Sequence, residues 1–369
     1  MRFTLTAVCG AARAGILETA HGVVHTPVFM PVGTLGPVKG IMPEMLRSLG
    51  AEMLLANTYH LALRPGAEIV QQLGGLARFT GWGGPTLTDS GGYQAFSLAP
   101  KRRISDAGVF FQSHLDGAPF DLTPERAIAI QQALGADVMM ALDECPPAGA
   151  DRADVAQAAE RTFAWARRCR EAWTQRQTQA LFGIVQGGVY EDLRRLSAQQ
   201  IADLNFPGNA IGGVAVGENE DDMRRIVAFT APLLPAGKPR YLMGVGRPQD
   251  ILIAIDCGVD MFDCVMPSRH GRHGEVFTAE GSIDLRHSAW RTYRGPIEEN
   301  CDCPACRSVS RAYLRHLFVA GEMLGPIYAT LHNLRFYLRL LAEARAAIAA
   351  GCYVAYCRSR LERFSLPRP

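Results

Sequence analysis

The sequence predicts an α/β protein built on a closed (β/α)8 barrel, with an N-terminal antiparallel hairpin cap and a C-terminal metal-binding subdomain. Three observations support this prediction: short apolar runs that alternate with longer amphipathic segments, polar or glycine-rich turns after most of these runs, and a cluster of cysteines near the end of the chain. A barrel of this kind occupies about 250 residues. The chain has 369 residues and therefore has length to spare at both ends.

The apolar runs have the composition of buried parallel strands. They are too short for helices and too uniformly apolar for half-exposed strands. The runs cover residues 28–30, 53–56, 86–88, 138–142, 181–185, 210–213, 241–243 and 261–262. An open doubly wound sheet is the alternative, but no Gly-x-Gly-x-x-Gly pattern follows a first strand, which counts weakly against it.

Several of the intervening segments carry helix signals. Thr123 is a candidate N-cap, Pro124 and Glu125 suit a first turn, and Gly135 can end the helix. Further helices are expected over residues 151–177, 191–204, 220–234, 248–257 and 325–350. The chain before the first apolar run is expected to form an antiparallel hairpin that caps one end of the barrel.

The composition excludes several classes of protein. The chain is 48% hydrophobic and 20% charged, with a net charge of +2, which is ordinary for a globular protein. No apolar run reaches the roughly 18 residues of a membrane span, and the N-terminus lacks the features of a secretory signal. We therefore expect a cytoplasmic protein that binds no membrane and whose cysteines are reduced.

Polar and glycine residues follow the apolar runs, where a (β/α)8 barrel builds its active site. Asp89, Asp143 and Asp263 each follow such a run. The other candidates at these strand ends are Ser90, Tyr93, Cys145, Gln186, Gly212, Gly213, Val214 and Met243. A single aspartate after a strand is more often a turn or N-cap residue than a catalyst. Together, however, these residues predict one carboxylate-rich pocket.

Such a pocket suits glycosidic-bond chemistry. Paired carboxylates beside a sugar carbon allow one group to attack the anomeric carbon while the other moves a proton. Glycines let backbone amides approach a flat ligand closely. Asp and Gln side chains can pair with the edge of a nucleobase, and Tyr93 or Met243 can stack on its face. The spacing alone predicts a barrel enzyme and leaves the substrate open.

Cys301, Cys303 and Cys306 are closely spaced and offer three thiolates. With one histidine they form a Cys3His set for tetrahedral zinc, and such a set leaves no open coordination position. We therefore expect one structural Zn²⁺, with His316 and His332 as rival fourth ligands. The chain then divides into an N-terminal β cap, a catalytic barrel and a zinc-binding subdomain with closing helices, over residues 1–27, 28–297 and 298–369.

Basic residues follow the last strand end. Arg269 and Arg272 lie shortly after Asp263, and Arg286, Arg291 and Arg294 come next. Arginines can position a nucleic acid through its phosphates without reading its sequence. A solvated loop explains them about equally well. A second basic group, at residues 101–103, is interpreted as a solvated turn.

From about Arg13 to Ala350 the chain resembles the bacterial form of the tRNA-guanine transglycosylase family. The resemblance rests on blocks in the family's order: residues 21–22, 26–34, 57–61, 88–94, 183–188, 212–213, 244–246 and 262–265, and the set Cys301, Cys303, Cys306 and His332. It implies an enzyme of queuosine biosynthesis that exchanges the wobble guanine of tRNAs with G-U-N anticodons, acts on the anticodon stem-loop and forms a homodimer.

The resemblance also implies roles for the candidate residues. Asp263 would attack C1′ of the ribose and Asp89 would be the general acid and base, so that a covalent aspartyl–ribose intermediate gives net retention. Arg269 and Arg272 would contact the flipped-out anticodon loop, and His332 would be the fourth zinc ligand. The base would be bound by Ser90, Tyr93, Asp143, Cys145, Gln186, Gly212, Gly213, Val214 and Met243.

Cys145 and Val216 match the bacterial form, whose incoming base is preQ1 (7-aminomethyl-7-deazaguanine), whereas the eukaryotic form takes queuine. Val214 departs from the leucine that often follows the two glycines, which leaves the choice between preQ1 and queuine open. Two alternatives remain. A catalytically silent tRNA-binding partner is disfavoured because Asp89 and Asp263 are both present, and an archaeal-type enzyme is disfavoured because little chain follows Cys306.

Overall fold

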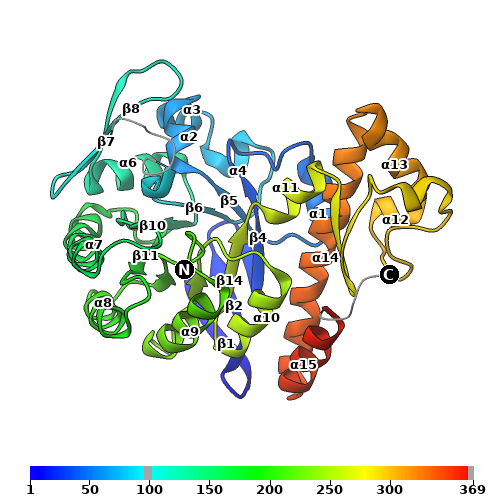
Figure 1. The fold of residues 1–369 in the computed structure, drawn as a ribbon. Helices are drawn as coiled ribbons and strands as arrows, with labels where there is room; N and C mark the ends of the chain where they lie inside the picture. Colours follow the sequence, from blue (N-terminus) through cyan, green and yellow to red (C-terminus); the bar gives the residue numbers. More distant parts are fainter. Residues whose placement is uncertain (95–101, 365–369) are drawn as a thin grey trace.

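The computed structural model describes residues 1–94 and 102–364. At its centre lies a closed barrel of eight parallel strands, which confirms the predicted fold class. The barrel closes where β14 pairs with β4, in the register Met261 to Val28. Each strand overlaps one of the apolar runs, with bounds that differ by up to three residues. The strands are β4 (Val28–Gly33), β5 (Leu54–Ala56), β6 (Thr86–Thr88), β10 (Val138–Met140), β11 (Ala180–Val185), β12 (Gly208–Ile211), β13 (Arg240–Leu242) and β14 (Met261–Cys264) (Figure 1).

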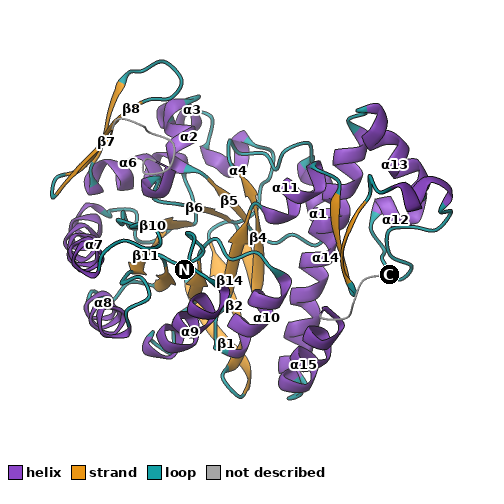
Figure 2. Cartoon of the chain, in the orientation of Figure 1, coloured by secondary structure: helices purple, strands orange, loops and turns teal. Residues whose placement is uncertain are grey.

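Helices surround the barrel (Figure 2). The predicted ones are α6 (Pro124–Leu134), α7 (Arg152–Ala172), α8 (Glu191–Asp203), α9 (Glu220–Thr230) and α10 (Pro248–Asp256). The Thr123 side chain caps α6 by accepting from the Arg126 amide, and Gly135 ends it in the left-handed conformation. The helix expected to reach residue 234 is α-helical only to Thr230 and continues as the 3-10 turn η1 (Ala231–Leu233), because Pro232 supplies no amide hydrogen.

Shorter helices occupy the remaining connections: α1 (Pro43–Ser48), α2 (Thr58–Leu63), α3 (Ala67–Gln72), α4 (Gly75–Phe79) and α11 (Met266–Arg272). Asn57 caps α2 by accepting from the His60 amide. The side chain that starts this helix therefore lies immediately beyond β5, at the carboxyl end of the barrel.

The N-terminal cap is an antiparallel sheet of three strands, β1 (Arg2–Cys9), β2 (Ala12–Thr19) and β3 (Gly22–Thr26). The predicted hairpin is present, and β3 adds a strand to it. The sheet covers the amino ends of the barrel strands, since the His21 amide donates to Asp137, directly before β10. Leu17 packs with side chains from inside the barrel. The cap therefore closes one end of the barrel and leaves the carboxyl ends of the strands accessible.

A second antiparallel sheet, which the sequence did not indicate, lies between β6 and α6. It consists of β7 (Arg102–Ser105), β8 (Gly108–Gln112) and β9 (Pro119–Leu122). The interpretation of residues 101–103 as a solvated turn is therefore wrong for Arg102 and Arg103, which pair with β8. An exposed edge strand tolerates such charged side chains. Lys101 lies outside the described residues.

The C-terminal region begins with the hairpin β15 (Glu275–Thr278) and β16 (Gly281–Asp284) and the 3-10 turn η2 (Ser288–Thr292). The helices α12 (Pro304–Ser308), α13 (Arg311–Ala320), α14 (Leu324–Ala349) and α15 (Tyr353–Phe364) follow. The long helix α14 confirms the expected one. It packs on the barrel through Tyr337, whose ring contacts Phe29 and whose hydroxyl donates to the Gly246 carbonyl.

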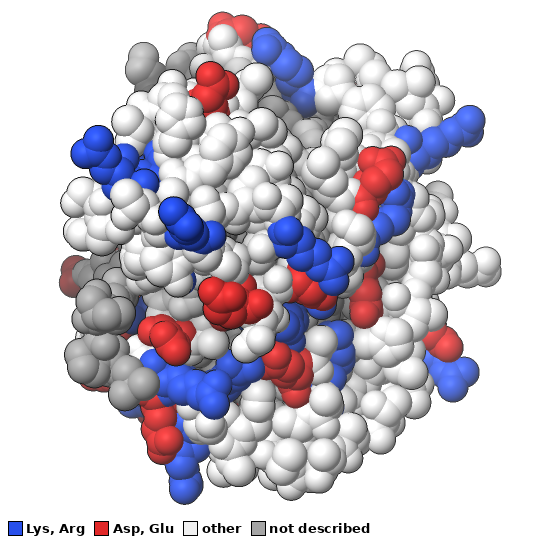
Figure 3. Space-filling model, turned by 90° about the vertical axis from the view of Figure 1, so that its right-hand side faces the viewer, with Lys and Arg blue, Asp and Glu red and all other residues white. Residues whose placement is uncertain are grey.

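None of the helices formed by residues 1–94 and 102–364 has the length and apolarity that a membrane crossing requires. On the face shown in Figure 3, Lys and Arg side chains are interspersed with Asp and Glu side chains, in keeping with the net charge of +2. The proposed division at residues 27/28 and 297/298 remains a prediction, because α14 packs on both the barrel and the cysteine-containing loop.

Candidate active site

The three predicted aspartates lie at the carboxyl ends of barrel strands. Asp89 directly follows β6, Asp143 comes shortly after β10, and Asp263 is part of β14. Asp89 and Asp263 are half-buried, and Asp143 is buried. The charge on Asp263 raises the pKa of Asp89, so these two carboxylates are close enough to interact. The fold therefore brings together residues that are far apart in the sequence.

Asp89 is held by three donors. Its Oδ1 accepts hydrogen bonds from the amides of Thr58 at 2.9 Å and Gly91 at 3.2 Å, and its Oδ2 accepts from Asn57 Nδ2 at 2.5 Å. Burial nevertheless raises the pKa of Asp89 to about 7, and Asp263 adds to the rise while the donors oppose it. A carboxyl group with a pKa near neutrality can both give and take a proton.

Asp263 has a different environment. Its Oδ1 accepts hydrogen bonds from the Tyr241 hydroxyl at 2.6 Å and from the Gly244 amide at 2.8 Å. Burial raises the pKa of Asp263, and these two donors lower it. No hydrogen bond to Oδ2 comes from residues 1–94 or 102–364, so this oxygen is available to attack an electrophile.

Tyr241 was not among the predicted site residues. It lies within β13, in a run that the sequence predicts only as a buried strand. Burial and the neighbouring Asp263 raise the pKa of Tyr241 well above its usual value, so the phenol keeps its proton and remains a donor. The available signal was its position two residues before Met243, because alternate residues of a strand point to the same side.

Asp143 and Gln186 form a buried polar pair beyond the carboxyl ends of β10 and β11. Gln186 Nε2 donates to Asp143 Oδ2 at 2.7 Å, and the Ser90 hydroxyl donates to Asp143 Oδ1 at 3.3 Å. Burial raises the pKa of Asp143 to about 6. Gln186 Oε1 is buried and has no partner among the described residues. A buried acceptor without a donor is costly, so this oxygen indicates a place for a ligand N–H group.

Gly212 and Gly213 lie against this pair. Gly213 has a φ of +63°, and a Cβ atom on it would lie 2.2 Å from Gln186 Oε1. A Cβ atom on Gly212 would lie 2.8 Å from Gln186 Nε2. Only glycine fits these two positions, because any side chain would occupy the space of the Gln186 amide. The backbone therefore forms one wall of the pocket.

The next turn is fixed by Glu218, which the sequence reasoning missed. Its carboxylate accepts hydrogen bonds from the amides of Ala215 and Val216. Because the carbonyl and amide hydrogen of a trans peptide point in opposite directions, the Val214 carbonyl points away from Glu218. No short motif around Glu218 distinguished it from a solvated acid. A hollow of about 410 Å³ adjoins this turn and is lined in part by Gly213, Val216 and Glu218.

The remaining predicted base contacts are more open. Tyr93 is half-exposed and Met243 is partly buried beside the barrel interior. Burial raises the pKa of Cys145 to about 12, so its thiol is neutral. Met243 directly follows β13, Cys145 lies in the loop after β10, and Tyr93 lies at the end of the described segment that precedes residue 95.

The basic residues lie on α11, directly after β14. Arg269 is exposed, and Arg272 is partly buried with its Nη1 donating to the Ser268 carbonyl at 3.1 Å. Burial and the adjacent Arg269 lower the pKa of Arg272. Both guanidinium groups lie near the strand that carries Asp263.

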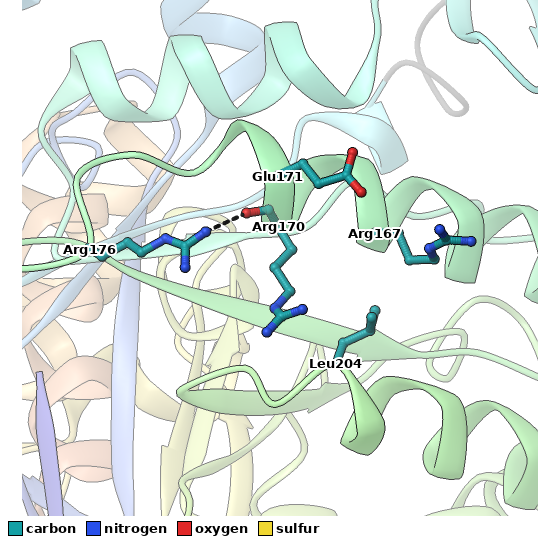
Figure 4. A pocket seen from close by; sticks show the side chains of 5 residues that line it. All are labelled: Arg167, Arg170, Glu171, Arg176 and Leu204. Atoms are coloured by element: carbon teal, nitrogen blue, oxygen red, sulfur yellow. Dashed lines mark hydrogen bonds between the residues drawn. The ribbon is translucent and has the colours of Figure 1, made fainter.

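Figure 4 shows a hollow of about 350 Å³ that is lined by arginines from the C-terminal part of α7 and the loop after it, and by Leu204 at the end of α8. Arg176 and Leu204, which line it, precede β11 and β12, so the hollow lies toward the amino ends of the strands. There Arg176 donates to the Arg170 carbonyl. This hollow is therefore remote from the aspartates.

The predicted metal ligands come together. The ligand atoms of Cys301, Cys303, Cys306 and His332 lie within 4.8 Å of one another. His332 Nδ1 lies 3.3–3.6 Å from the three sulfur atoms, and tetrahedral zinc separates nitrogen and sulfur ligands by about 3.6 Å. His332 Nε2 lies 2.7 Å from the Phe277 carbonyl, which keeps the proton on that nitrogen and leaves Nδ1 free to bind a metal.

His316, the rival ligand, is not part of this group. It stacks on Tyr313 within α13, with 6.3 Å between the ring centroids. The sequence could not decide between the two histidines from spacing, because α14 brings His332 back to the cysteine loop from a distant position in the chain. The cluster can hold one metal ion and has the donor set that zinc prefers.

A barrel with interacting aspartates at the carboxyl ends of its strands has the arrangement of an enzyme that acts on glycosidic bonds. The family model described as queuine tRNA-ribosyltransferase matches residues 9–365. The chain belongs to this family, which confirms the prediction of a tRNA-guanine transglycosylase, a pentosyltransferase that modifies tRNA.

Three curated relatives, each named queuine tRNA-ribosyltransferase, illustrate the similarity. The protein of Symbiobacterium thermophilum is 52% identical over 354 residues, covering 96% of this chain and 88% of the relative. That of Solidesulfovibrio magneticus is 51% identical over 361 residues, covering 98% and 96%. That of one Thermus thermophilus strain is 53% identical over 362 residues, covering 98% and 94%. The similarity therefore spans the barrel and the cysteine loop.

Proposed function

We propose that this enzyme replaces the wobble guanine of G-U-N anticodon tRNAs with preQ1 through a covalent aspartyl–ribose intermediate, in queuosine biosynthesis. The observation that carries the proposal is the unequal environment of the two aspartates. Asp89 has a pKa of about 7, whereas Asp263 has two donors on one oxygen and none on the other from the described residues. Unequal environments separate a proton shuttle from a nucleophile.

In the first step, Asp263 Oδ2 forms a bond to C1′ of the wobble ribose while the bond from C1′ to guanine N9 breaks. The bonding electrons go to the guanine, and protonated Asp89 gives its proton to the departing base. Tyr241 and Gly244 hold the other oxygen of Asp263 and so fix its direction of attack. Flipping the nucleotide out of the anticodon loop exposes C1′, and Arg269 and Arg272 would hold the neighbouring phosphates.

In the second step, the ionised Asp89 removes a proton from preQ1, whose nitrogen then attacks C1′. The bond between C1′ and Asp263 breaks, and the aspartate leaves with the electron pair. Each displacement inverts C1′, so the two together retain its configuration. Asp89 ends protonated and Asp263 ionised, as at the start.

The base would lie between Tyr93 and Met243, with its edge toward Asp143. The Asp143 carboxylate, oriented by Ser90 and Gln186, would accept from N1–H and the 2-amino group, and the unpartnered Gln186 Oε1 offers a further acceptor. The Gly213 amide would donate to O6, the acceptor on this edge. Gly212 and Cys145 complete the wall.

The Val214 carbonyl would accept from the aminomethyl group of preQ1. Glu218 holds the adjoining peptide by its amide hydrogen, which turns this carbonyl away from the carboxylate. A valine in place of leucine leaves the carbonyl unchanged. Val216 restricts the space beside it, so we propose preQ1 in preference to queuine.

One Zn²⁺ would be held by Cys301, Cys303, Cys306 and His332, where it would hold the loop to α14 and take no part in the reaction. We also propose that the enzyme is a cytoplasmic homodimer that binds the tRNA anticodon stem-loop. Exposed apolar side chains on α13 and at the turn that leads to α14 offer a surface for a second copy: Tyr313, Val319, Met323 and Leu324.

The test is exchange into a purified tRNA with a G-U-N anticodon that carries radiolabelled guanine at the wobble position. The proposal is supported if preQ1 releases the label at a lower base concentration than queuine does. Release with queuine at lower concentration would transfer the assignment to queuine. Tight tRNA binding without release by either base would instead identify a silent tRNA-binding partner.

A further inference from the structure

We propose that Arg194 on α8 is a positioning residue that fixes the donor wall of the base pocket. Its side chain is wholly buried. Nε donates to the Gly188 carbonyl at 2.8 Å, Nη1 to the carbonyls of Val185 at 3.1 Å and Gly212 at 2.7 Å, and Nη2 to the Gly213 carbonyl at 3.0 Å. One guanidinium group thus joins the ends of β11 and β12.

The charge of Arg194 is unusual for such a position. Arg13, another buried arginine, forms an ion pair with Asp260, whereas no carboxylate pairs with Arg194 among the described residues. Burial lowers the pKa of Arg194 to about 10, so it remains protonated at neutral pH. An unpaired buried cation is costly. Four carbonyl dipoles compensate for it, together with the charge of the nearby Glu218. All four carbonyls come from the segments that carry Gln186 and Gly213.

These hydrogen bonds determine where the Gly213 amide points. The Gly212 carbonyl and the Gly213 amide hydrogen belong to one trans peptide and point in opposite directions. Since the carbonyl points to Arg194, the amide hydrogen points away from it. A hydrogen bond from a cation also polarises the peptide and strengthens its amide as a donor. The positive φ of Gly213 also directs the Gly213 carbonyl toward Arg194, whose Nη2 donates to it.

Arg194 fixes the other side of the pocket through Val185 and Gly188. Gln186 lies between these two residues in the sequence. Its backbone amide donates to Ser197 Oγ at 3.1 Å, and Ser197 lies on α8, the helix that carries Arg194. The Gln186 side chain therefore starts from a backbone held on both sides by α8. A shift of the end of β11 or β12 would move the side-chain amide of Gln186 relative to Gly213. The two groups are so close that no side chain fits at position 213.

The inference rests on the proposed function, in which Gln186 and Gly213 hold the purine edge. It predicts that Arg194 governs recognition of O6. Two variants test this. Arg194→Lys keeps the charge but loses the planar fork of donors, and Arg194→Gln keeps an amide donor without the charge. The matched control is Arg240→Lys, because Arg240 is also buried and donates to the Leu234 and Gly258 carbonyls, at the opposite end of the barrel.

The measurements are KM for guanine and for tRNA, and the inhibition constants of guanine and 2-aminopurine, which lacks O6 and the N1–H group; Asp143, the proposed acceptor for N1–H, is unchanged in the variants. We expect both Arg194 variants to raise KM for guanine about tenfold, the effect of one misaligned hydrogen bond. Their preference for guanine over 2-aminopurine should fall by about the same factor, with KM for tRNA unchanged. Arg240→Lys should lower the melting temperature and leave the base preference at the wild-type value.

Unchanged base preference in either folded Arg194 variant would overturn the inference, since a purely structural role affects stability alone. Should one variant not fold, the other gives the same comparison. Should neither fold, the positioning role is replaced by a structural one. Failure of the proposed function is distinguishable, because the wild-type enzyme itself would then not exchange guanine.

Discussion

The hydroxyl of Tyr241 donates to Asp263 Oδ1 at 2.6 Å, from the strand next to the one that carries the aspartate. This contact holds one carboxylate oxygen and leaves the other for the ribose. It also lowers the pKa of Asp263 against the effect of burial. Tyr241 is therefore part of the arrangement that keeps the proposed nucleophile ionised and oriented.

Replacement of this tyrosine tests the contact. In Tyr241→Phe the Asp263 pKa should rise, because a donor to the ionised form is lost. A nucleophile must be ionised, so the loss of activity at low pH should begin at a higher pH, and kcat should fall about tenfold. The measurement is the pH–rate profile. Tyr353→Phe is the control, since the Tyr353 hydroxyl is also buried but donates to the Leu252 carbonyl on α10. Equal profiles for both variants would contradict the role of Tyr241.

The proton shuttle is tested by Asp89→Asn, because asparagine neither gives nor takes a proton. We expect kcat to fall by about 10²–10⁴. In the wild type, guanine departure requires protonated Asp89, whose pKa is about 7. The single-turnover rate of guanine release should therefore decline as pH rises through 7, and this decline should be absent from the variant. Asp137→Asn, at the amino end of β10, is a matched control that should keep the wild-type profile.

We expect the ionised Asp143 carboxylate to lower the free energy of unfolding, although the same carboxylate is needed to bind the base. Its folded pKa of about 6 lies above the usual value of 3.8, so its ionisation destabilises the fold as pH rises from about 4 to 6. In Asp143→Asn the Gln186 amide can turn, so that its unpartnered oxygen accepts from the new amide. We expect the variant to be more stable by about 1–3 kcal/mol at pH 7.5 and to bind guanine poorly.

Thermal unfolding at pH 4 and at pH 7.5 provides the measurement for Asp143→Asn. The gain in melting temperature should be present at pH 7.5 and small at pH 4, where the wild-type carboxyl group is already neutral. A variant less stable than wild type at both values would show that the Asp143 carboxylate stabilises the pocket.

The metal site offers a direct comparison of two histidines. His332→Ala should abolish tight binding of one equivalent of zinc and lower the melting temperature, because the ligand also joins α14 to the cysteine loop. His316→Ala, in the stacked pair with Tyr313, should retain the metal. Metal content after dialysis and thermal unfolding measure both effects. Full zinc content in His332→Ala would exclude the proposed ligand set.

The strands were predictable because most of them are buried on both faces, so their runs are mostly apolar. The carboxylates were predictable because polar residues directly after such runs converge at one end of a barrel. Tyr241 was missed because it lies within the apolar run that predicted its strand, and a tyrosine in such a run is expected to be a core residue. β7 to β9 were missed because each strand is short, and the buried residues of β8, Val109 and Phe111, are too few to form a sustained pattern.

Other features depend on contacts between distant parts of the chain. Arg194 is an ordinary residue of an amphipathic helix by sequence, and only the meeting of α8 with the ends of β11 and β12 surrounds it with carbonyls. Glu218 likewise gains its role from a turn whose shape depends on the positive φ of Ala215. The fourth metal ligand could be identified as His332 and not His316 only once the course of α14 past the cysteine loop was known.

The proposed mechanism depends above all on a covalent bond between Asp263 and the ribose. The most direct measurement mixes the enzyme with an anticodon stem-loop RNA and the dead-end base 9-deazaguanine, and then separates the products on a denaturing gel. We expect a shifted protein–RNA band for the wild type that is absent from Asp263→Ala, although that variant still binds the RNA. A band of wild-type intensity in Asp263→Ala would exclude Asp263 as the nucleophile, and an active wild type that forms no band would exclude a covalent intermediate.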